Sequence, residues 1–347
     1  MATLQAADIA DLITTTQRDL GKMRWTEIAT DLQEHVAMSQ ILNKEKVQFG
    51  SGQAIQWNVM TGTSGASKNV GLYEVDQVNV ADVMTTATIP WRHTTTNYAI
   101  ERREIAMNRS PAAIVSLVKV RRSDALIDLA GLMETNFWND PANDNLTPFG
   151  VPYWAAYTSG TDGFLGGNPT NYTGGAGGLD TATFPRWNNY CFTYTSVTKT
   201  SAVREWRRAA TFTGFKSPLM GLPGSMPDYN RGNRYGYYTN YNVIGPLEEA
   251  LEAQNMNLGN DIASKDGQLV FRQNPVVWVP QLENATGDPI YGLNWGVFYP
   301  CFLSGEYMHE EGPAKASNQH TVFQTHIDMT YNFKCTNRRL IFVGRTA

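Results

Sequence analysis

The segment from Ser110 to Trp138 constrains the fold most, because it predicts a single helix of unusual length. Ser110 is a favoured N-cap residue, and Pro111 follows at the first helical position, where its missing N–H costs nothing. Asp140-Pro141 ends the segment, since a residue that precedes proline is disfavoured in helical backbone. A helix of this length spans roughly 43 Å, far more than the usual helix of about 11 or 12 residues.

Apolar residues recur in this segment at steps of three and four, as on one face of a helix. They are Ile114, Leu117, Val118, Ala125, Leu129, Leu132 and Met133. Lys119, Arg122, Asp124 and Asp128 lie mostly off that face. A helix that is apolar on one side only must pack along an element of similar length.

Residues 323–335 supply such an element, because they alternate strictly between two kinds of side chain. The odd positions carry Phe, Thr, Ile, Met, Tyr, Phe and Cys, and the even positions carry Gln, His, Asp, Thr, Asn and Lys. This period of two predicts a strand that spans roughly 43 Å. We therefore expect the long helix to lie on a long sheet that contains this strand.

Composition excludes several classes of protein. At 347 residues, the chain exceeds the size at which a single core stops growing, so two lobes are expected. A net charge of −4 argues against a dedicated nucleic-acid binder. No apolar run reaches the length of about 18 residues that predicts a membrane span, and the first residues lack the positive charge of a signal peptide. The widely spaced Cys191, Cys301 and Cys335 form neither a disulfide pattern nor a zinc pattern, so we expect a soluble protein made in a reducing cytosol.

Residues 1–45 predict an arm with weak helical character. Trp25, Ile28, Leu32 and Val36 have helical spacing, but so few apolar residues cannot form a core. The arm must therefore lie on another surface, either of its own body or of a neighbouring molecule.

Residues 46–100 predict a hairpin. Its two alternating strands contain Val47, Phe49, Ile55, Trp57 and Val59 on the way out, and Ala87, Ile89, Trp91, Tyr98 and Ile100 on the way back. The connection from Thr61 to Asp82 is rich in Gly, Ser and Thr at first and then acidic. A two-stranded hairpin is marginal in water without a surface to pack on, so we expect this one to project toward a partner. The alternative is two ordinary strands of a central sheet.

The chain after the long helix predicts loops followed by an inserted lobe. The run GGAGG at 174–178 follows no strand and opens no helix, so we interpret it as a flexible surface loop and not as a dinucleotide-binding loop. Thr200 or Ser201 should cap a second helix. Residues 216–311 predict an α/β lobe whose helix starts at Pro246, and the last segment of the chain should return to the first lobe.

Few residues predict catalytic chemistry. His320, His326 and Asp328 share one face of the last predicted strand and could ligate a metal, but their spacing matches no ligand pattern and a solvated polar face explains them equally well. There is no nucleophile elbow, P-loop or kinase motif. We therefore expect no catalytic, cofactor or metal site. A soluble α/β metal-dependent enzyme that uses the His326/Asp328 face is the alternative.

The order of these parts resembles the major capsid proteins of tailed bacteriophages, which have the Hong Kong 97 fold. The stretches that carry the resemblance are YAIERREIAMNRSPAAIVSLVKVRRSDALIDLAGLMETNFW at the start of the long helix, VVWVPQL, PIYGLNWGVFYP and CTNRRLIFV. The resemblance implies an α+β fold with an N-terminal arm (1–45), an E-loop hairpin (46–100), a peripheral domain (101–215 and 312–347) with a spine helix (110–138), and an axial domain (216–311).

The resemblance also implies a function and partners. The chain should assemble as pentamers and hexamers into an icosahedral shell that encloses the double-stranded DNA genome of a tailed phage. An encapsulin-like nanocompartment shell is the alternative within this fold. A separate scaffolding protein, a portal, a decoration or cement protein and non-specific contact with packaged DNA are expected, without a membrane or a cofactor. The protein should be made in the cytoplasm of the bacterial host and reside in the virion.

In this family the hairpin of one subunit lies over the peripheral domain of its neighbour, so acidic hairpin residues should meet basic residues near the spine helix. The expected hairpin contacts are Lys68, Leu72, Tyr73, Glu74, Val75, Asp76 and Asp82. The expected contacts of the spine region are Arg102, Arg103, Arg109, Lys119, Arg121 and Arg122, and those of the arm are Trp25, Ile28 and Leu32. A solvated face is the alternative for Arg121, Arg122 and residues 101–104.

Some relatives join a hairpin lysine covalently to an asparagine of a neighbouring subunit. Here the candidates are Lys68 with Asn332 or Asn337. A single lysine near a loop tip is usually solvated, so we expect no cross-link.

Overall fold

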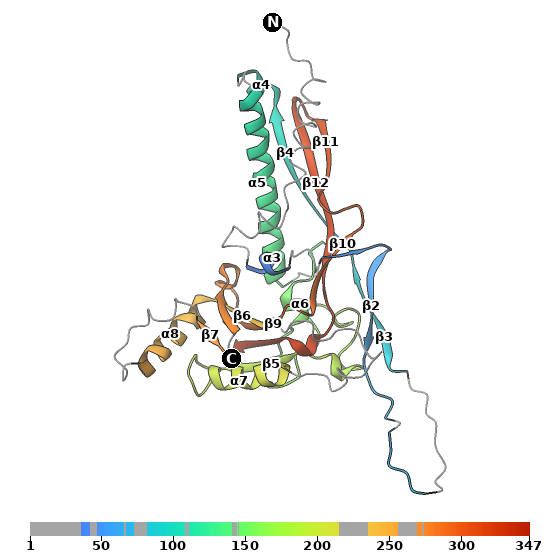
Figure 1. Ribbon diagram of the computed structural model, residues 1–347, viewed down its shortest axis with the longest axis vertical. Coiled ribbons are helices and arrows are strands. Elements are labelled where there is room, and N and C mark those ends of the chain that lie inside the picture. The colour runs from blue at the N-terminus through green and yellow to red at the C-terminus, as the bar shows by residue number, and fades with distance from the viewer. Residues whose placement is uncertain are drawn as a thin grey trace.

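The computed structural model describes residues 36–41, 47–65, 67–72, 82–107, 111–140, 144, 146–214, 235–255, 269–272 and 274–347. Figure 1 shows an elongated molecule. A long helix and a sheet of long strands rise from a body that is built around another sheet. A hairpin leaves the body in the opposite direction.

The long helix and the long strand are both present, as predicted. Helix α5 covers Pro111–Trp138 and strand β12 covers Gln319–Cys335, which are 28 and 17 residues long. One edge of β12 pairs with β4 (Arg92–Glu101), and α5 lies along these strands (Figure 1). On its other edge, the N-terminal part of β12 pairs with β11 (His309–Ala316) and its C-terminal part pairs with β10 (Phe298–Leu303). The short β1 (Gln48–Gly50) lies parallel to β10.

The predicted alternation in β12 holds for its buried face. Every odd position from Phe323 to Cys335 is buried. The other face is buried in part, since its Thr330 and Asn332 are buried as well. The Asn332 carboxamide accepts a hydrogen bond from Phe149 N (2.8 Å) and donates one to Pro90 O (2.8 Å), because the chain covers this end of the sheet on both sides.

A second, six-stranded sheet forms the body. Its order is β5 (Tyr190–Tyr194), β13 (Phe342–Thr346), β9 (Ile290–Asn294), β6 (Tyr235–Thr239), β8 (Asn274–Trp278) and β7 (Val270–Phe271). Helices α7 (Ala202–Thr213) and α8 (Tyr241–Asn255) accompany it. Trp206 of α7 contacts Tyr237 and Phe271, and these aromatic rings belong to the core of the sheet.

The predicted boundaries of the two lobes need correction. The sequence analysis placed β5, α7 and β13 with the long helix and β10 in the inserted lobe, whereas β5 and β13 pair within the second sheet and β10 pairs with β12. The chain crosses to the second sheet after β12, at the 3₁₀ turn Arg338–Leu340. The buried Arg338 fixes this turn by donating to Trp154 O (2.7 Å), Gly167 O (3.0 Å) and Asn189 Oδ1 (2.9 Å). Partners so distant in sequence leave no local signal.

The hairpin is shorter than predicted. Strands β2 (Ala54–Met60) and β3 (Met84–Pro90) pair with each other, but β1 and β4, which the prediction included, belong to the long sheet. Tyr98 and Ile100 of β4 are buried, so the alternation that suggested a hairpin strand reflects packing in the long sheet.

The glycine-rich run at 174–178 is not a flexible surface loop, and that interpretation is wrong. Ala176 and Gly177 are buried, Gly177 O accepts a hydrogen bond from Thr88 N of β3 (2.9 Å), and Gly177 N donates to the Tyr153 hydroxyl (2.9 Å). Gly175 has φ +84°, and a Cβ there would lie 2.0 Å from Leu179 O. The glycines therefore permit a tight turn that holds the base of the hairpin.

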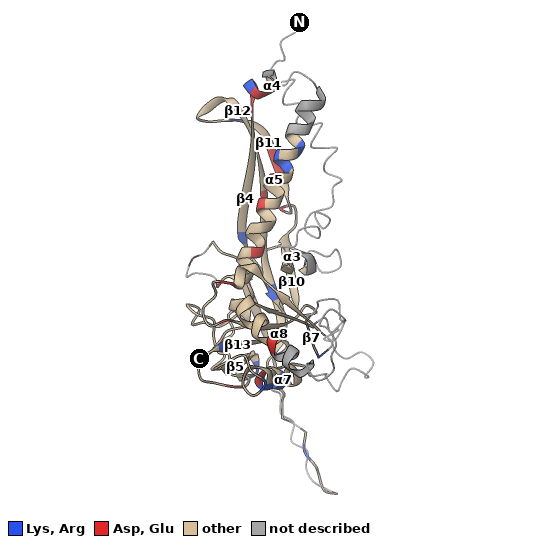
Figure 2. Ribbon diagram, turned by 90° about the vertical axis from the view of Figure 1, so that its left-hand side faces the viewer, with Lys and Arg blue, Asp and Glu red and all other residues tan. Residues whose placement is uncertain are grey.

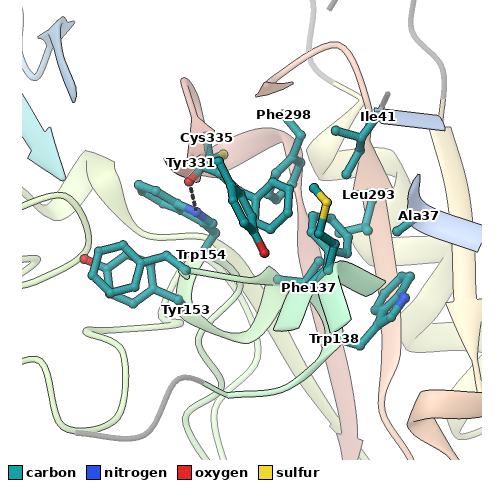
Figure 3. Packing of buried hydrophobic residues seen from close by; sticks show 14 of the residues in the cluster. Ala37, Ile41, Phe137, Trp138, Tyr153, Trp154, Leu293, Phe298, Tyr331 and Cys335 are labelled. Atoms are coloured by element: carbon teal, nitrogen blue, oxygen red, sulfur yellow. Dashed lines mark hydrogen bonds between the residues drawn. The ribbon is translucent and has the colours of Figure 1, made fainter. Parts of the chain in front are cut away.

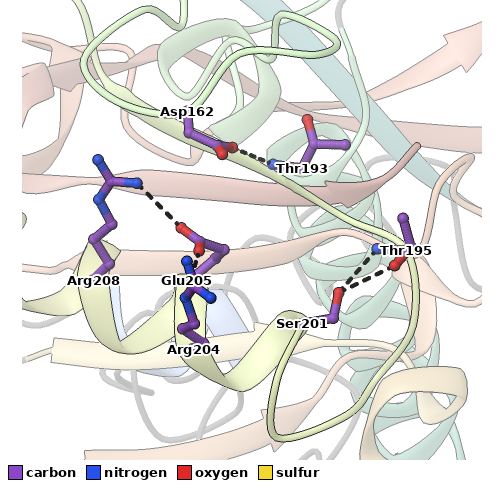
Figure 4. A network of polar contacts seen from close by, with 7 residues as sticks. All are labelled: Asp162, Thr193, Thr195, Ser201, Arg204, Glu205 and Arg208. Atoms are coloured by element: carbon purple, nitrogen blue, oxygen red, sulfur yellow. Dashed lines mark hydrogen bonds and ion pairs between the residues drawn. The ribbon is translucent and has the colours of Figure 1, made fainter.

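One predicted helix start differs, and a second stands where predicted but without the expected cap hydrogen bond. Helix α8 begins at Tyr241 and contains Pro246, whereas the prediction started it at Pro246. Glu283 Oε1 accepts from Tyr241 N (2.9 Å) and satisfies one N–H group of the first turn from outside the helix. Ser201 does precede α7, but its hydroxyl makes no cap and accepts instead from Thr195 N (3.2 Å). Figure 4 shows this contact beside the ion pairs of Glu205 with Arg204 and Arg208.

The main core lies where the end of α5 meets both sheets (Figure 3). The Phe137 ring packs against Phe333 at 5.1 Å and against Trp295 at 5.8 Å, and the neighbouring Trp138 packs against Tyr238 at 5.3 Å. The short helices α3 (Val36–Ile41), α4 (Arg102–Met107) and α6 (Val151–Trp154) complete the described helices. One turn of α5 thus joins the two lobes.

Candidate interaction surfaces

The far end of the hairpin exposes apolar side chains. Met60 and Met84 face each other across the two strands and are 43% and 54% exposed, and Leu72 beyond them is 91% exposed. Lys68 and Asp82 are exposed there as well, whereas Tyr73, Glu74, Val75 and Asp76 lie outside the described residues. Exposed apolar groups at the end of a projecting element favour burial against another molecule.

The base of the hairpin is held firmly on the body. Ile55, Val59, Ala87 and Ile89 are buried, and Trp57 packs against Trp154 with ring centroids 6.0 Å apart. The structure thus fixes the direction in which the hairpin projects.

Two of the predicted spine contacts have partners within the chain. Arg122 is buried and its guanidinium donates to Glu310 Oε1 of β11, through Nε at 2.7 Å and also through Nη2. Arg121 donates to Ala99 O and pairs with Glu104 at 2.7 Å. Both side chains therefore fasten α5 to the sheet and to α4, an arrangement that neither alternative of the sequence analysis included.

The remaining basic residues of this region face outward. Arg102, Arg103 and Lys119 are exposed, and Arg103 makes only a solvent-exposed pair with Glu101 at 3.7 Å. Figure 2 shows basic residues at this end of the molecule, at α4 and on α5 beyond its grey first turns. Arg109 lies outside the described residues.

The outer face of α5 is partly apolar. Val120 is 64% exposed and Ile127 is 40% exposed, and both lie on the side of the helix that carries Asp124 and Asp128. Leu132, which was predicted to lie on the buried stripe, is 42% exposed. This mixed surface offers apolar area beside the basic residues.

The arm contacts Trp25, Ile28 and Leu32 lie outside the described residues, but α3 shows how the following segment is held. Ala37, Met38 and Ile41 are buried in the main core. The buried Glu134 carboxylate of α5 accepts from the backbone amides of Ala37 and Met38 and from Trp138 Nε1. Burial raises the pKa of Glu134 above its ordinary value, against the lowering effect of these hydrogen bonds.

The polar face of the long sheet does not gather a metal site. His326 lies opposite Glu311, and Asp328 lies opposite His309, so acidic and imidazole side chains alternate on an open surface. Within the described ranges, no group of three His, Cys, Asp or Glu side chains is arranged to hold a metal ion. None of the helices described here is both long enough and apolar enough to cross a membrane.

The three cysteines are buried and free. Burial raises the pKa of Cys335 to about 12 and that of Cys301 to about 11, so both remain thiols at neutral pH.

The asparagines considered for a cross-link have structural roles. Asn332 is fully buried in the hydrogen bonds described above, and the Asn337 side chain accepts from Arg339 N at the turn after β12. Sequence reasoning missed these roles and those of Glu134 and Arg338. The sequence gives a signal for Glu134, because its spacing from Ala130, Met133 and Phe137 places a carboxylate on the apolar face of the long helix.

No family model matches the chain, and no curated protein matches it. Solved structures do match over nearly its whole length. The capsid asymmetric unit of cyanophage A-1(L) is 16% identical and aligns over 90% of this chain and 93% of that chain, with a TM-score of 0.61. The capsid of a native GTA particle is 11% identical and aligns over 91% of each chain, with a TM-score of 0.59. The chain therefore has the fold of phage capsid proteins, and the resemblance stated from the sequence is confirmed at the level of the fold.

Proposed function

We propose that this chain is a major capsid protein, the subunit that assembles into the icosahedral shell around the double-stranded DNA of a tailed phage. The observation that carries the proposal is the match to capsid subunits over nine-tenths of the chain. Because fold alone does not determine function, the surfaces of this chain have to support the proposal independently.

The shape of the molecule supports a shell subunit. The hairpin projects away from the body, is fastened at its base and exposes Met60, Met84 and Leu72 at its far end. The far end of such an element gains stability by packing on another molecule, and identical contacts repeated around a closed shell provide that surface. The role is therefore structural and not enzymatic.

We assign the parts of the Hong Kong 97 fold as follows. The E-loop is the hairpin β2–β3 with its connection, and α5 is the spine helix. The peripheral domain consists of α5 with β4, β10, β11 and β12, and the axial domain is built on the second sheet. The arm precedes α3.

We further propose that the acidic part of one hairpin docks on the basic end of the spine of a neighbouring copy. Arg102, Arg103 and Lys119 supply the exposed charge, and Arg109 adds to it in sequence. Arg121 and Arg122 hold the spine in place within their own subunit. Leu72, with Tyr73 and Val75, contributes apolar contact, and Val120 beside Lys119 offers a matching surface.

The partners follow from this role. The subunits form pentamers and hexamers, with a separate scaffolding protein, a portal and a decoration or cement protein as further partners. Contact with packaged DNA is non-specific. The protein is made in the bacterial cytoplasm and resides in the virion. No covalent cross-link forms through Lys68, since Asn332 is buried and Asn337 caps a turn.

Electron microscopy of the purified protein, expressed alone and together with a candidate scaffolding protein, tests the proposal. Closed shells or isolated pentamers and hexamers are the expected products. A monomer that stays monomeric at every concentration and salt condition, with or without the scaffold, would refute a shell function.

A further inference from the structure

A small cavity lies where the hairpin leaves the body. Its volume is about 200 Å³, and its wall includes Gln48, Ser51, Gln56, Trp91, Cys301 and Lys334. These residues come from β1, from β2 and the turn before it, and from β10, β12 and the residue before β4. The cavity is smaller than the ~300 Å³ typical of sites for small-molecule ligands, but it exceeds the volume of several water molecules at ~30 Å³ each. It therefore fits the end of one side chain.

The wall of this cavity carries one cation. The Lys334 ammonium donates to Gln48 Oε1 at 2.7 Å and lies 5.6 Å from the ring centroid of Trp57 and 5.8 Å from that of Tyr299. Within the part of the chain that the structure describes, no carboxylate forms an ion pair with it. Cys301, the other titratable residue of the wall, stays a neutral thiol because burial raises its pKa.

Burial disfavours the charge of Lys334 and lowers its pKa. The Gln48 amide oxygen and the two aromatic faces attract the ammonium but carry no negative charge to neutralise it. A partly buried cation without a counter-ion gains free energy when a carboxylate enters, because the pair forms charge-assisted hydrogen bonds.

Gln48 adds donors of the same kind. Its Oε1 accepts from both Lys334 Nζ and Cys301 Sγ, so this oxygen faces the two donors. The two N–H groups of the Gln48 amide have no partner among the described residues, and the exposed Ser51 adds a hydroxyl to the wall. An ammonium, an amide and a hydroxyl together suit a ligand with two acceptor oxygens.

We propose that this cavity receives an aspartate or glutamate carboxylate from a second copy of this chain, with Lys334 as its ion-pair partner. The proposal rests on the proposed shell function. Charge complementarity supports a carboxylate as the occupant, since Lys334 carries the one formal charge of the cavity wall. The position of the cavity supports it as well, because a carboxylate bound there would link the base of one hairpin to a neighbour and fix their relative angle.

Amine labelling of the wild-type protein provides a test. Isolated subunits and assembled shells are treated with an acetylating reagent, and the modification of each lysine is measured by mass spectrometry. Lys334 should react about tenfold more slowly in shells than in subunits. Lys199, which is exposed in the loop before α7, is the control and should change little.

Zero-length carbodiimide cross-linking identifies the partner. In shells assembled from mixed ¹⁴N and ¹⁵N subunits, Lys334 peptides should be joined to acidic peptides of the other isotope. A K334Q variant that folds normally should assemble only at a concentration about tenfold higher, while K334R should restore assembly.

Each outcome bears on one proposal. Shells in which Lys334 reacts as fast as in subunits would overturn the carboxylate site and leave the shell function standing. Protection of Lys334 in isolated subunits by acetate, without further protection in shells, would assign the cavity to a free anion and overturn the second-copy partner. Failure of every preparation to form shells would overturn both proposals.

Discussion

Glu134 and Ala37 lie 97 positions apart in the chain, yet the Glu134 carboxylate accepts the Ala37 backbone N–H at 2.8 Å. The same carboxylate accepts from Met38 N at 2.8 Å and from Trp138 Nε1 at 2.6 Å. A side chain of α5 therefore caps the short helix α3 from outside, in the place that an N-cap residue normally fills. This contact fastens the segment that follows the N-terminal arm to the spine.

Replacing Glu134 by alanine should destabilise the subunit by about 2–4 kcal/mol, because three buried N–H donors lose their acceptor. E134Q retains one acceptor oxygen and should cost less. Urea unfolding of the two variants and the wild type measures the difference, and limited proteolysis near residues 42–46 reports release of α3. Equal stability of E134A and wild type would show that the contact contributes nothing.

The Glu134 contact also predicts a dependence on pH. Burial raises the pKa of Glu134 in the folded chain above the ordinary value of 4.5. At a pH between 4.5 and the folded pKa, Glu134 is therefore protonated in the folded chain and ionised in the unfolded chain. The contribution of Glu134 to stability therefore falls as pH rises through this window and is greatest below 4.5. Unfolding free energies from pH 4 to pH 8 should show this trend in the wild type relative to E134Q. A difference that does not vary with pH would contradict the shift.

Sequence periodicity predicted the helix and the strand that organise the fold. Both α5 and β12 are long enough for spacing alone to identify them, and α5 starts at Pro111 and ends at Trp138 as expected. The membership of the sheets could not be predicted in the same way. The pairing of β13 with β5, or of β10 with β12, depends on contacts between distant segments, for which local pattern carries no information.

The candidate surfaces were predicted in part, for a related reason. Composition identified the basic region around α4 and α5, but only the structure separates the exposed Arg102 and Lys119 from Arg122, which is paired with Glu310. Likewise, glycines in a loop predict a turn. The burial of residues 175–177 could not be predicted, because it depends on where β3 of the hairpin lies in the folded chain.

The glycine turn under the hairpin should tolerate alanine unevenly. Gly178 has φ +75° and open space around the position of a Cβ, so G178A should cost only the backbone term of about 1–2 kcal/mol. Gly175 has a similar φ, but a Cβ there would lie 2.0 Å from Leu179 O, so G175A should cost clearly more. Chemical unfolding of both variants provides the comparison. Equal losses would mean that the turn relaxes without resistance.

The two ion pairs of the spine should differ in strength. Arg122 and Glu310 have side chains only 9% and 18% exposed, so E310Q should destabilise the subunit by about 3–5 kcal/mol, since it removes a negative charge that faces a buried guanidinium. Arg121 and Glu104 are 31% and 33% exposed, and E104Q should cost about 0–1 kcal/mol. Urea unfolding of the two Gln variants measures the loss of unfolding free energy in each. A larger loss in E104Q than in E310Q would refute the prediction.

The acidic part of the hairpin should affect the rate of shell assembly more than the stability of the finished shell. Reversing both charges in E74K/D76K should slow shell formation several-fold at low salt, because attraction toward Arg102, Arg103 and Lys119 becomes repulsion. At about 1 M salt, where the screening length is ~3 Å, the variant and the wild type should assemble at similar rates. Each exposed pair contributes only about 0–1 kcal/mol, so the finished shells should have similar stability. Light scattering during assembly measures the rates.

Two controls make this experiment specific to the docking surface. The variant E248K/E249K changes the net charge equally at exposed positions of α8 and should assemble close to the wild-type rate. Combining E74K/D76K with R102E/R103E exchanges the charges on both sides and should recover part of the lost rate. If the exchanged variant is slower than either double variant, or if E74K/D76K assembles at the wild-type rate in low salt, the hairpin does not dock on this end of the spine.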